Sequence, residues 1–527
     1  MMLSNRPAAL AAGLIVLIAA LCALLLALPG ETITTVYVND LLIFLDGAHR
    51  IASGQVPNRD FHTPLGPLTF YLPALGYWLS GNLGGAMPVG MALLVLGLAP
   101  VTAHVLTSRL RPVIALLFGA FAILILAVPM NLGESIAALS FAMFYNRIGW
   151  AALAILLVMY LRPEQARPRK EVLDALCAAL LTLVMLYTKV TYGLFALVFL
   201  AFLLLDTQQR RWAALAIGLT LVTGLIAEVF WRSSMAHLAD LLLTGKVSGA
   251  RGHVDLVLGF LRHLADYVMF AMLAALALWR TRSVRDLLFF GFCAVPGLLI
   301  MNQNSQPWGI ITLHAGAAVA AEMLMRSAQR REEAQSGLQG AVPERRPSLA
   351  LGAPLLLLAL LLPTTVHCFM ALSLHASLGV AQAGERFGMP NFDRVRLAQL
   401  WSPGDHSFSS GYLASLQDGA RALADLDVKP NRVSVLDFVS PFSAGLGLAP
   451  PQGDSAWLHW GRNVNAAHFL PPEELFHGVE VLMVPKWGIN NVPLIDLYGT
   501  HISRAFDPVR ETEFWTVYRK RERPAER

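Results

Sequence analysis

Long apolar runs separated by short polar turns dominate the first two thirds of the chain. A helix needs roughly 20 apolar residues to cross the hydrocarbon of a bilayer, so the chain contains about eleven candidate membrane helices. We expect the first run to be retained, because no convincing small-residue cleavage site follows it. The candidates are Pro7–Leu28, Ala86–Leu106, Val113–Pro129, Ile148–Leu161, Val172–Tyr187, Tyr192–Leu205 and Trp212–Phe230, then segments centred near Met272, Val295, Ala317 and Leu358.

The composition also predicts a membrane protein with many spans, which makes the fold class mainly α. Hydrophobic residues fill 56% of the 527 positions, charged residues only 14%, and the mean hydropathy is +0.55. These values are too apolar for a soluble chain of this length. The net charge of +5 is modest and does not indicate a nucleic-acid partner. The cysteines lie inside apolar runs and offer no disulfide framework: Cys22, Cys177, Cys293 and Cys368.

Basic residues gather at every second junction between the apolar runs. Lys and Arg in short loops stay preferentially on the cytoplasmic side of a membrane. We therefore expect a multi-pass protein of a bacterial inner membrane, with a cytoplasmic N-terminus and a periplasmic C-terminal part. The basic groups are Arg6, Arg109/Arg111, Arg162/Arg167/Arg169/Lys170, Arg210/Arg211, Arg280/Arg282/Arg285 and Arg326/Arg330/Arg331/Arg345/Arg346.

The last part of the chain differs in kind and predicts a small periplasmic α/β domain. From about Gly384 the sequence becomes mixed, and the strand-like runs RVSVLDFV, VEVLMVP and EFWTVYRK are separated by Pro, Gly and Asn. We divide the chain into a transmembrane module, residues 1–371, and this domain, residues 372–527. The first periplasmic loop is expected at residues 30–83. The polar linker at residues 332–348 is expected to have no regular structure.

The loop after the first apolar run is rich in charged residues and prolines. Residues 39–72 read NDLLIFLDGAHRIASGQVPNRDFHTPLGPLTFYL. A helix over residues 38–53 would place its apolar residues on one stripe, as expected of a helix lying in the membrane interface. On its other face, Asp46 and Arg50 have the spacing of an ordinary ion pair. Asp40 lies at the edge of the stripe, where it either caps the helix or takes part in chemistry.

The exit from this helix is a stiff polar elbow. Gly54 is expected to end the helix, and prolines at positions 57, 64 and 67 lead into a second short helix over residues 68–79. Aromatic residues on the second helix suit a membrane interface. Asp60 and His62 lie in the elbow and are candidate substrate contacts.

Cations near helix ends are candidates for binding a phosphate. Lys189 lies between two apolar segments, at the depth of a lipid phosphate, although a snorkelling lysine is the alternative interpretation. The loop LLTGKVSGARGHV, residues 242–254, is expected to be flexible and adds Lys246, Arg251 and His253. Solvated loop charges are the alternative there.

Other polar residues in or near the apolar runs are weaker candidates. Glu134 and Glu228 lie near helix ends, where solvation explains them. Asp437 follows a predicted strand, and ligands bind at the carboxyl ends of strands in α/β folds. Three single histidines are interpreted as hydrogen-bonding partners between helices and not as metal ligands: His104, His314 and His367.

The first loop resembles that of the GT-C glycosyltransferases. The shared features are an apolar first helix, an acidic residue, a helix ending in SGQVPNRDF, and the Pro-led aromatic helix GPLTFYLPALGYWLSG. The closest comparison is the group of protein O-mannosyltransferases and lipid A aminoarabinose transferases. MLYTKVTYGLFAL resembles the lysine turn of that group, and NQNSQPWGIITLHA resembles its proline-containing turn before a late helix.

This resemblance implies an enzyme that transfers a sugar from a polyprenyl-phosphate-linked donor to a periplasmic glycan, lipid or protein acceptor. Asp40 matches the loop-one acid of the family, which acts as base or orients the acceptor. Asn39 departs from the adjacent acids common in the family, and the second loop offers Asn146 and Arg147 in place of a further acid. Gln306, in the proline-containing turn, is another candidate contact. Metal dependence stays open, because carboxylates are the strongest ligands for a divalent ion.

The chemistry of glycosyl transfer fits two of these positions. The acceptor hydroxyl loses its proton as it attacks, which suits Asp40, and the departing phosphate needs positive charge, which suits Lys189. A transporter or lipid flippase is the alternative function. Such proteins tend to show paired repeats and matching broken helices, and the sequence shows neither. An inactive scaffold that presents the C-terminal domain also stays open.

Overall fold

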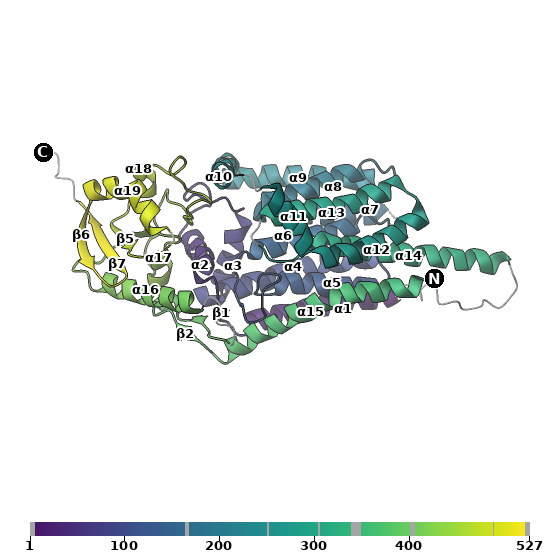
Figure 1. Cartoon of the computed structure of the whole chain (residues 1–527), viewed down its shortest axis with the longest axis horizontal. Helices are drawn as coiled ribbons and strands as arrows, with labels where there is room; N and C mark the ends of the chain where they lie inside the picture. Colours follow the sequence, from purple (N-terminus) through teal and green to yellow (C-terminus); the bar gives the residue numbers. More distant parts are fainter. Residues whose placement is uncertain are drawn as a thin grey trace.

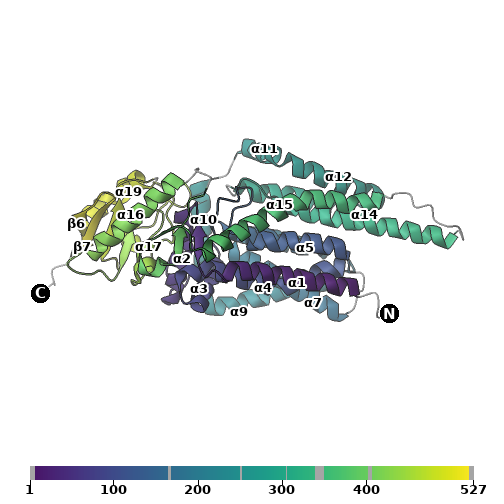
Figure 2. The ribbon, with the colours of Figure 1, turned by 90° about the horizontal axis from the view of Figure 1, so that it is seen from below.

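The computed structural model is an elongated multi-pass membrane protein with a helical bundle at one end and a mixed α/β domain at the other (Figure 1). The structure describes residues 6–163, 168–249, 252–303, 306–338, 349–400, 406–488 and 490–521. The end of the bundle that meets the α/β domain is called the domain end. The two chain termini lie at opposite ends of the molecule (Figure 2).

The bundle consists of long apolar helices, and every predicted membrane segment is helical. Within the described residues, seven helices are long and apolar enough to cross a membrane, three apolar helices are shorter (α5, α6 and α8), and α14 is more polar. The number of crossings therefore stays a prediction. The helices are α1 Arg6–Ala27, α4 Leu83–Arg109, α5 Pro112–Ala127, α6 Phe144–Val158, α7 Pro168–Thr188, α8 Val190–Leu203, α9 Arg210–Trp231, α12 Leu264–Thr281, α13 Val284–Gln303, α14 Ile311–Leu338 and α15 Leu349–Val380.

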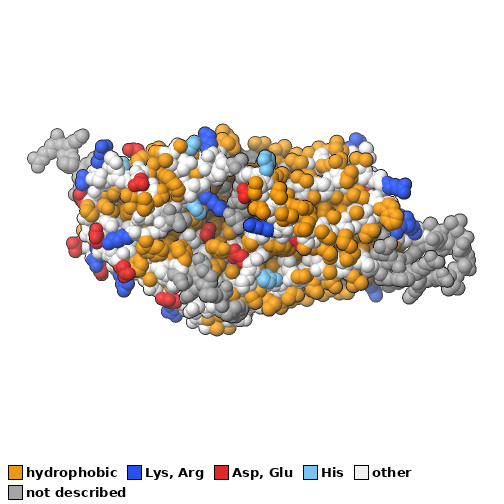
Figure 3. Space-filling view, viewed as in Figure 1, with side chains coloured by type: hydrophobic (Ala, Val, Ile, Leu, Met, Phe, Trp, Pro, Cys, Tyr) orange, Lys and Arg blue, Asp and Glu red, His pale blue; other side chains and the backbone are white. Residues whose placement is uncertain are grey.

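Arginines at the end of the bundle away from the α/β domain bind buried carboxylates. Arg109 donates to Asp174 over 2.7 Å, and Arg162 and Arg285 both pair with Asp206. A buried charge needs such a partner, which explains acidic residues within apolar helices. Apolar side chains cover most of the visible bundle surface, whereas many charged side chains gather on the α/β domain (Figure 3).

The first loop forms β1 Thr32–Thr34, α2 Val38–Ala52 and α3 Leu68–Ser80, so both predicted loop helices exist. The expectation that α2 lies in the membrane interface stays a prediction, but its second face is not exposed. Of its 15 residues, 12 are buried, and α2 packs against α3, α4 and the short helix α17 of the α/β domain. A stripe of apolar residues predicts one buried face, and the C-terminal domain covers the other.

The predicted strands of the C-terminal domain exist. The main sheet has the order β4-β5-β7-β6, with β4 and β5 parallel and the other pairs antiparallel. Of these strands, β6 is absent from the sequence prediction. The elements are β2 Glu385–Arg386, η1 Pro390–Phe392, β3 Val395–Leu397, α16 His406–Ala424, β4 Val433–Val435, α17 Pro441–Leu446, α18 Pro472–Leu475, β5 Val481–Pro485, α19 Asn491–Ala505, β6 Phe506–Glu511 and β7 Trp515–Lys520.

The first loop and the C-terminal part share a second, small sheet. Its order is β1-β3-β2, and β1 pairs with β3 in parallel, with Thr32 opposite Val395. Glu31, just before β1, forms a buried ion pair with Arg396 of β3. The predicted domain boundary at residue 371 falls inside α15, which continues to Val380.

Two stretches that the sequence presents as irregular are largely helical. The predicted flexible loop at residues 242–254 is wrong over most of its length, because α10 spans Ser234–Ser248 and α11 spans His253–Arg262. Gly245 is accommodated inside α10, since a single glycine weakens a helix without ending it. The predicted linker also begins inside a helix, because α14 continues to Leu338. Residues 339–348 lie outside the described residues.

Candidate active site at the domain end

Asp40 lies in the first turn of α2, but it is not the N-cap of that helix. The N-cap is Tyr37, which has a left-handed φ of 54° and makes no side-chain capping hydrogen bond. Three residues later, Asp40 is part-buried, and a negative charge in a first helical turn is favourable. Asp40 is therefore not the N-cap, but an acid at this third position can still interact with the free N–H groups of the first turn, so a helix-stabilising role stays an alternative.

The carboxylate of Asp40 acts on two tyrosines from different parts of the fold. Tyr145, near the start of α6, is within electrostatic reach of both Asp40 and Arg462. Tyr412 belongs to α16 of the C-terminal domain. Burial raises the pKa of Tyr412 well above its usual value, and the carboxylates of Asp437 and Asp40 raise it further. The start of α2 thus lies between the bundle and the C-terminal domain.

Lys189 also lies close to Tyr145. It occupies the turn between α7 and α8, and its Nζ donates to Asn146 Oδ1 over 3.1 Å. The same Nζ lies 5.4 Å from the centre of the Tyr145 ring, within range of a cation–π interaction. Asp40, Tyr145 and Lys189 therefore form one cluster at the domain end, with Asn146 holding the lysine.

The elbow of the first loop holds the lysine turn in place. The Gly66 N–H donates to the Thr188 carbonyl oxygen over 3.1 Å, and the Thr69 hydroxyl donates to the same oxygen over 3.2 Å. A Cβ at Gly66 would lie 2.2 Å from the carbonyl oxygen of Tyr187. Only glycine permits this approach, so the sequence GP at the start of α3 fixes the backbone next to Lys189.

Both helices that carry this cluster begin after a strained residue. Tyr37 precedes α2 with φ 54°, and Met143 precedes α6 with φ 49°. A non-glycine residue in the left-handed region costs of order 1–3 kcal/mol and persists where surrounding contacts enforce it. For Tyr37 such a contact is visible, since its hydroxyl donates to Glu134 over 2.8 Å. The strain is stored beside Asp40 and Asn146.

Two of the predicted substrate-binding residues, Arg147 and Gln306, make hydrogen bonds within the bundle that point to structural roles. Arg147 is buried and donates to the Ala142 carbonyl oxygen over 3.2 Å, while its Nε and Nη2 have no hydrogen-bond partner. Gln306 accepts from Trp150 Nε1 over 3.2 Å and donates to the Trp308 carbonyl oxygen over 2.8 Å. These contacts explain Gln306 without a substrate, whereas the two unpaired nitrogens of Arg147 are not explained by them.

The elbow residues Asp60 and His62 are also explained by local contacts. Asp60 accepts from the Val56 N–H over 2.7 Å. His62 lies between two carboxylates, with Nδ1 2.7 Å from Asp240 and Nε2 2.8 Å from Glu474. Burial alone lowers the pKa of His62, but its hydrogen bonds to Asp240 and Glu474 outweigh burial and raise the pKa to about 9. His62 therefore joins the elbow, α10 and α18 as a cation.

The predicted pair Asp46 and Arg50 is confirmed, but it is buried and larger than expected. Arg50 Nε donates to Asp46 over 2.6 Å, and its two terminal nitrogens donate to Asp454 of the C-terminal domain over 2.8 and 2.9 Å. Gln55 completes the group by donating to the Pro451 carbonyl oxygen over 2.7 Å. This network fixes α2 against the C-terminal domain.

The remaining candidates divide into exposed and structural residues. Lys246 is exposed on α10, His253 is exposed at the start of α11, and Arg251 lies outside the described residues. Glu228 accepts from the Ser234 N–H and so closes the turn after α9. Of the three single histidines, His104 forms the predicted hydrogen bond between helices, with Asp174 of α7. His314 bonds the Ile310 carbonyl four residues earlier, and His367 bonds the Glu134 carbonyl in a loop, so the prediction is wrong for these two.

No group of three or more His, Cys, Asp or Glu side chains that could hold a metal ion occurs within the described ranges. The four cysteines are free and buried.

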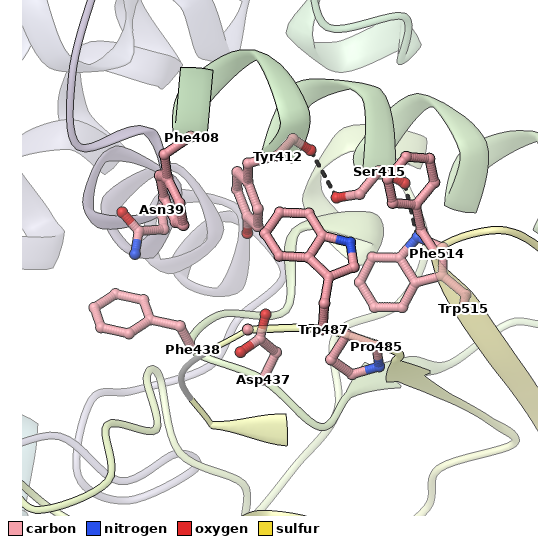
Figure 4. A pocket seen from close by; sticks show the side chains of 11 residues that line it. Asn39, Phe408, Tyr412, Ser415, Asp437, Phe438, Pro485, Trp487, Phe514 and Trp515 are labelled. Carbon is pink, nitrogen blue, oxygen red and sulfur yellow. Dashed lines mark hydrogen bonds between the residues drawn. The ribbon is translucent and has the colours of Figure 1, made fainter. Parts of the chain in front are cut away.

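A pocket opens beside the cluster, in the C-terminal domain. Asp437 lies two residues beyond β4, and Trp487 and Gly488 follow β5, so the pocket forms at the carboxyl ends of two parallel strands. Figure 4 shows Asp437 beneath the rings of Tyr412 and Trp487. Asn39, the neighbour of Asp40, also lines the pocket. The weak sequence signal at Asp437 therefore marks a real cavity.

Three residues near Asp40 were missed by the sequence analysis: Tyr145, Tyr412 and Arg462. Tyr145 had a signal, because it directly precedes Asn146 in FYNRIGWA. Tyr412 and Arg462 had none, since they reach Asp40 only through the docking of the C-terminal domain.

Comparisons with known proteins give structural similarity only. No protein-family model matches the chain, and no curated protein matches it in sequence. The crystal structure of ArnT from Cupriavidus metallidurans in the apo state is similar with a TM-score of 0.47 and 14% identity, over 96% of this chain and 97% of that one. The oligosaccharyltransferase from Archaeoglobus fulgidus is similar with a TM-score of 0.37 and 11% identity, over 89% of this chain and 67% of that one. At these TM-scores and identities, neither likeness decides the family, the reaction or the substrates.

Proposed function

We propose that this protein is a membrane glycosyltransferase that moves a sugar from a polyprenyl-phosphate-linked donor to a glycan, lipid or protein acceptor. One observation carries the proposal: Asp40 and Lys189 both interact with Tyr145 at the domain end of an apolar bundle. A carboxylate and a cation gathered around one side chain suit the transfer of a group from a lipid phosphate.

In the proposed reaction, the acceptor hydroxyl oxygen attacks the anomeric carbon of the donor sugar. Its proton passes to the Asp40 carboxylate as the new carbon–oxygen bond forms. The bond between the anomeric carbon and the phosphate oxygen breaks, and the lipid phosphate leaves with the bonding electrons. Lys189 neutralises the charge that develops on this phosphate, and Arg462 is a second nearby cation. Asn146 acts as a positioning residue, since it accepts from Lys189.

The proposed membrane orientation is a cytoplasmic N-terminus and a periplasmic C-terminal domain in a bacterial inner membrane. The arginine-rich ends of the helices support this orientation, because basic residues favour the cytoplasmic side. A reporter that is active only in the cytoplasm, fused after Lys520, is expected to be silent, and its activity there would reverse the orientation.

The competing function, transport or lipid flipping, predicts a polar site near the middle of the membrane. The cluster and the adjoining pocket lie instead where the bundle meets the C-terminal domain. This asymmetry favours chemistry at a membrane surface.

Removing the negative charge of Asp40 tests the proposed base. Asp40→Asn should reduce sugar transfer by roughly 100-fold or more, the scale of losing a positioned proton acceptor. The assay follows transfer of radiolabelled sugar from a polyprenyl-phosphate donor in membranes. Asp393→Asn, at an exposed site, is the matched control and should transfer normally. Near-normal transfer by Asp40→Asn would remove Asp40 from the chemistry.

Removing the cation tests the phosphate site. Lys189→Ala should weaken the use of donor by about tenfold or more, because a hydrogen bond to a charged group contributes roughly 1.5–3 kcal/mol. The loss should appear mainly in the KM for the donor, measured as above. Lys520→Ala, an exposed lysine on β7, is the control. An unchanged donor KM in Lys189→Ala would contradict this role.

A further inference from the structure

The pocket beside Asp40 has the chemistry of a ligand site in its own right. It lies between the C-terminal domain and the first turn of α2, and its walls are mostly aromatic. Trp487 has 37% of its surface exposed, and its ring lies 6.3 Å from the rings of both Phe408 and Phe514. Exposed, rigid ring faces of this kind offer large contact area at low entropic cost.

The floor of the pocket is a carboxylate with few partners. Asn490 Nδ2 lies 3.5 Å from Asp437 Oδ1, a long contact, and the backbone of Phe438 supplies another hydrogen bond. Burial raises the pKa of Asp437 to about 6 despite these bonds. Asp437 is part-buried, and at a pH well above its pKa the carboxylate is charged and is stabilised by any further donor that a ligand supplies.

The backbone next to this carboxylate is a glycine. Gly488 has φ +128°, a conformation that favours glycine, and a Cβ there would lie 3.8 Å from Asp437 Oδ1. Position 488 therefore carries no side chain at the point where a ligand would approach Asp437.

The charge of the pocket excludes ligands that would place a phosphate group in it. Among the described residues that line it, none is a lysine or an arginine. A phosphate beside an ionised aspartate without a cation would be repelled, so the pocket does not suit the lipid-phosphate group of the donor. Flat aromatic faces with one carboxylate suit a ring that has apolar C–H faces and hydrogen-bond donors at its edge.

We propose that this pocket binds one pyranose ring, packed on Trp487 and donating a hydroxyl or ammonium hydrogen to Asp437. The ring belongs to the acceptor, an assignment that rests on the proposed function, because Asn39 lines the pocket and the adjacent Asp40 is the proposed base. The acceptor is then a glycan or a glycolipid, and not an unmodified protein.

Saturation-transfer NMR on the full-length protein tests this site without any transfer reaction. The protein is kept in a detergent without a sugar headgroup, and the probes are methyl β-glucopyranoside and methyl β-glucosaminide. Saturation should reach the ring protons in the wild type. Asp437→Asn should weaken binding about tenfold, as expected for losing a charged hydrogen-bond acceptor, and Trp487→Ala should abolish the signal. Asp507→Asn, an exposed aspartate of the same domain, should bind normally.

The two probes separate a neutral sugar from an amino sugar. If the glucosaminide binds more tightly than the glucopyranoside, the pocket recognises an amino sugar of the acceptor. If the two probes bind equally, the pocket recognises a neutral sugar. Both results support the proposal. Binding of neither probe, or equal binding in Trp487→Ala with an unchanged melting temperature, would overturn it. Asp40→Asn should still bind the probes. Binding without transfer in the wild type contradicts only the proposed function, whereas transfer without binding contradicts only the pocket.

Discussion

Two polar junctions tie the first loop to the C-terminal domain, and they hold their charge differently. In one, Arg50 has no exposed side-chain surface and donates to Asp46 and Asp454. In the other, His62 lies between Asp240 and Glu474 with 28% of its side chain exposed. A guanidinium keeps its proton at every physiological pH, whereas an imidazolium loses it. The Arg50 junction is therefore permanent, and the His62 junction depends on pH.

This difference determines how each junction responds when one charged partner is lost. Burying a charge is costly, and the cost is offset only while every partner is present. The Arg50 junction contains one cation and two buried carboxylates, so the loss of Arg50 leaves both carboxylates without a cation. Glu474 in the His62 junction is 43% exposed, so water can replace a lost partner.

Breaking the permanent junction should have the largest effect. Arg50→Met leaves Asp46 and Asp454 buried without a cation, which should lower the free energy of unfolding by about 3–5 kcal/mol. Thermal unfolding in detergent measures the loss, and limited proteolysis should show release of the C-terminal domain. Arg59→Met removes an exposed partner of Asp60 and should cost less than about 1 kcal/mol. Equal losses in the two variants would contradict the contrast between buried and exposed pairs.

Raising the pH should break only the second junction. The folded-state pKa of His62, about 9, lies above its ordinary value of 6.5. Its stabilisation is therefore complete below pH 6.5 and is lost as the pH rises through 9. We expect a total loss of about 2 kcal/mol, after allowance for solvent screening at Glu474. Melting temperatures from pH 6 to 10 should fall more steeply in the wild type than in His62→Gln. Parallel curves would remove His62 as the cause.

Removing the charge of Glu474, the exposed partner of His62, should have the smallest effect on the free energy of unfolding. Glu474→Gln keeps the shape of the side chain and removes one of the two charges on His62. The expected loss at pH 7 is below about 1 kcal/mol, because the carboxylate is half exposed. The fall in melting temperature should still begin near pH 6.5 but end at a lower pH, since the folded-state pKa of His62 drops. A loss as large as that of Arg50→Met would mean that the two junctions do not differ.

The sequence predicts elements well where local pattern decides them. The apolar runs marked every bundle helix, and the helix predicted over residues 38–53 is α2, Val38–Ala52. The strand-like runs became β4, β5 and β7. In each of these, hydrophobic periodicity and the flanking Gly and Pro act within a few residues.

Prediction from the sequence fails where packing against distant segments determines the surroundings of a residue. The second buried face of α2 and the partner Asp454 of Arg50 come from residues some 400 positions away. No local pattern encodes them, so Asp46 and Arg50 look like a surface pair. Arg462 and Tyr412 approach Asp40 for the same reason. A candidate base could be named from the sequence, but its surroundings required the packing of the two parts.

The pairing of β1 with β3 has a consequence for synthesis on the ribosome. Thr32–Thr34 emerges early, yet its partner Val395–Leu397 is made after the whole bundle. Contacts between such distant segments form late, and an incomplete strand pair leaves backbone groups exposed. The strand before α2 therefore cannot pair until most of the chain has been synthesised. A product that stops short of β3 cannot complete the loop that presents Asp40. Under the proposed function, a truncated chain of this kind is expected to be inserted but inactive.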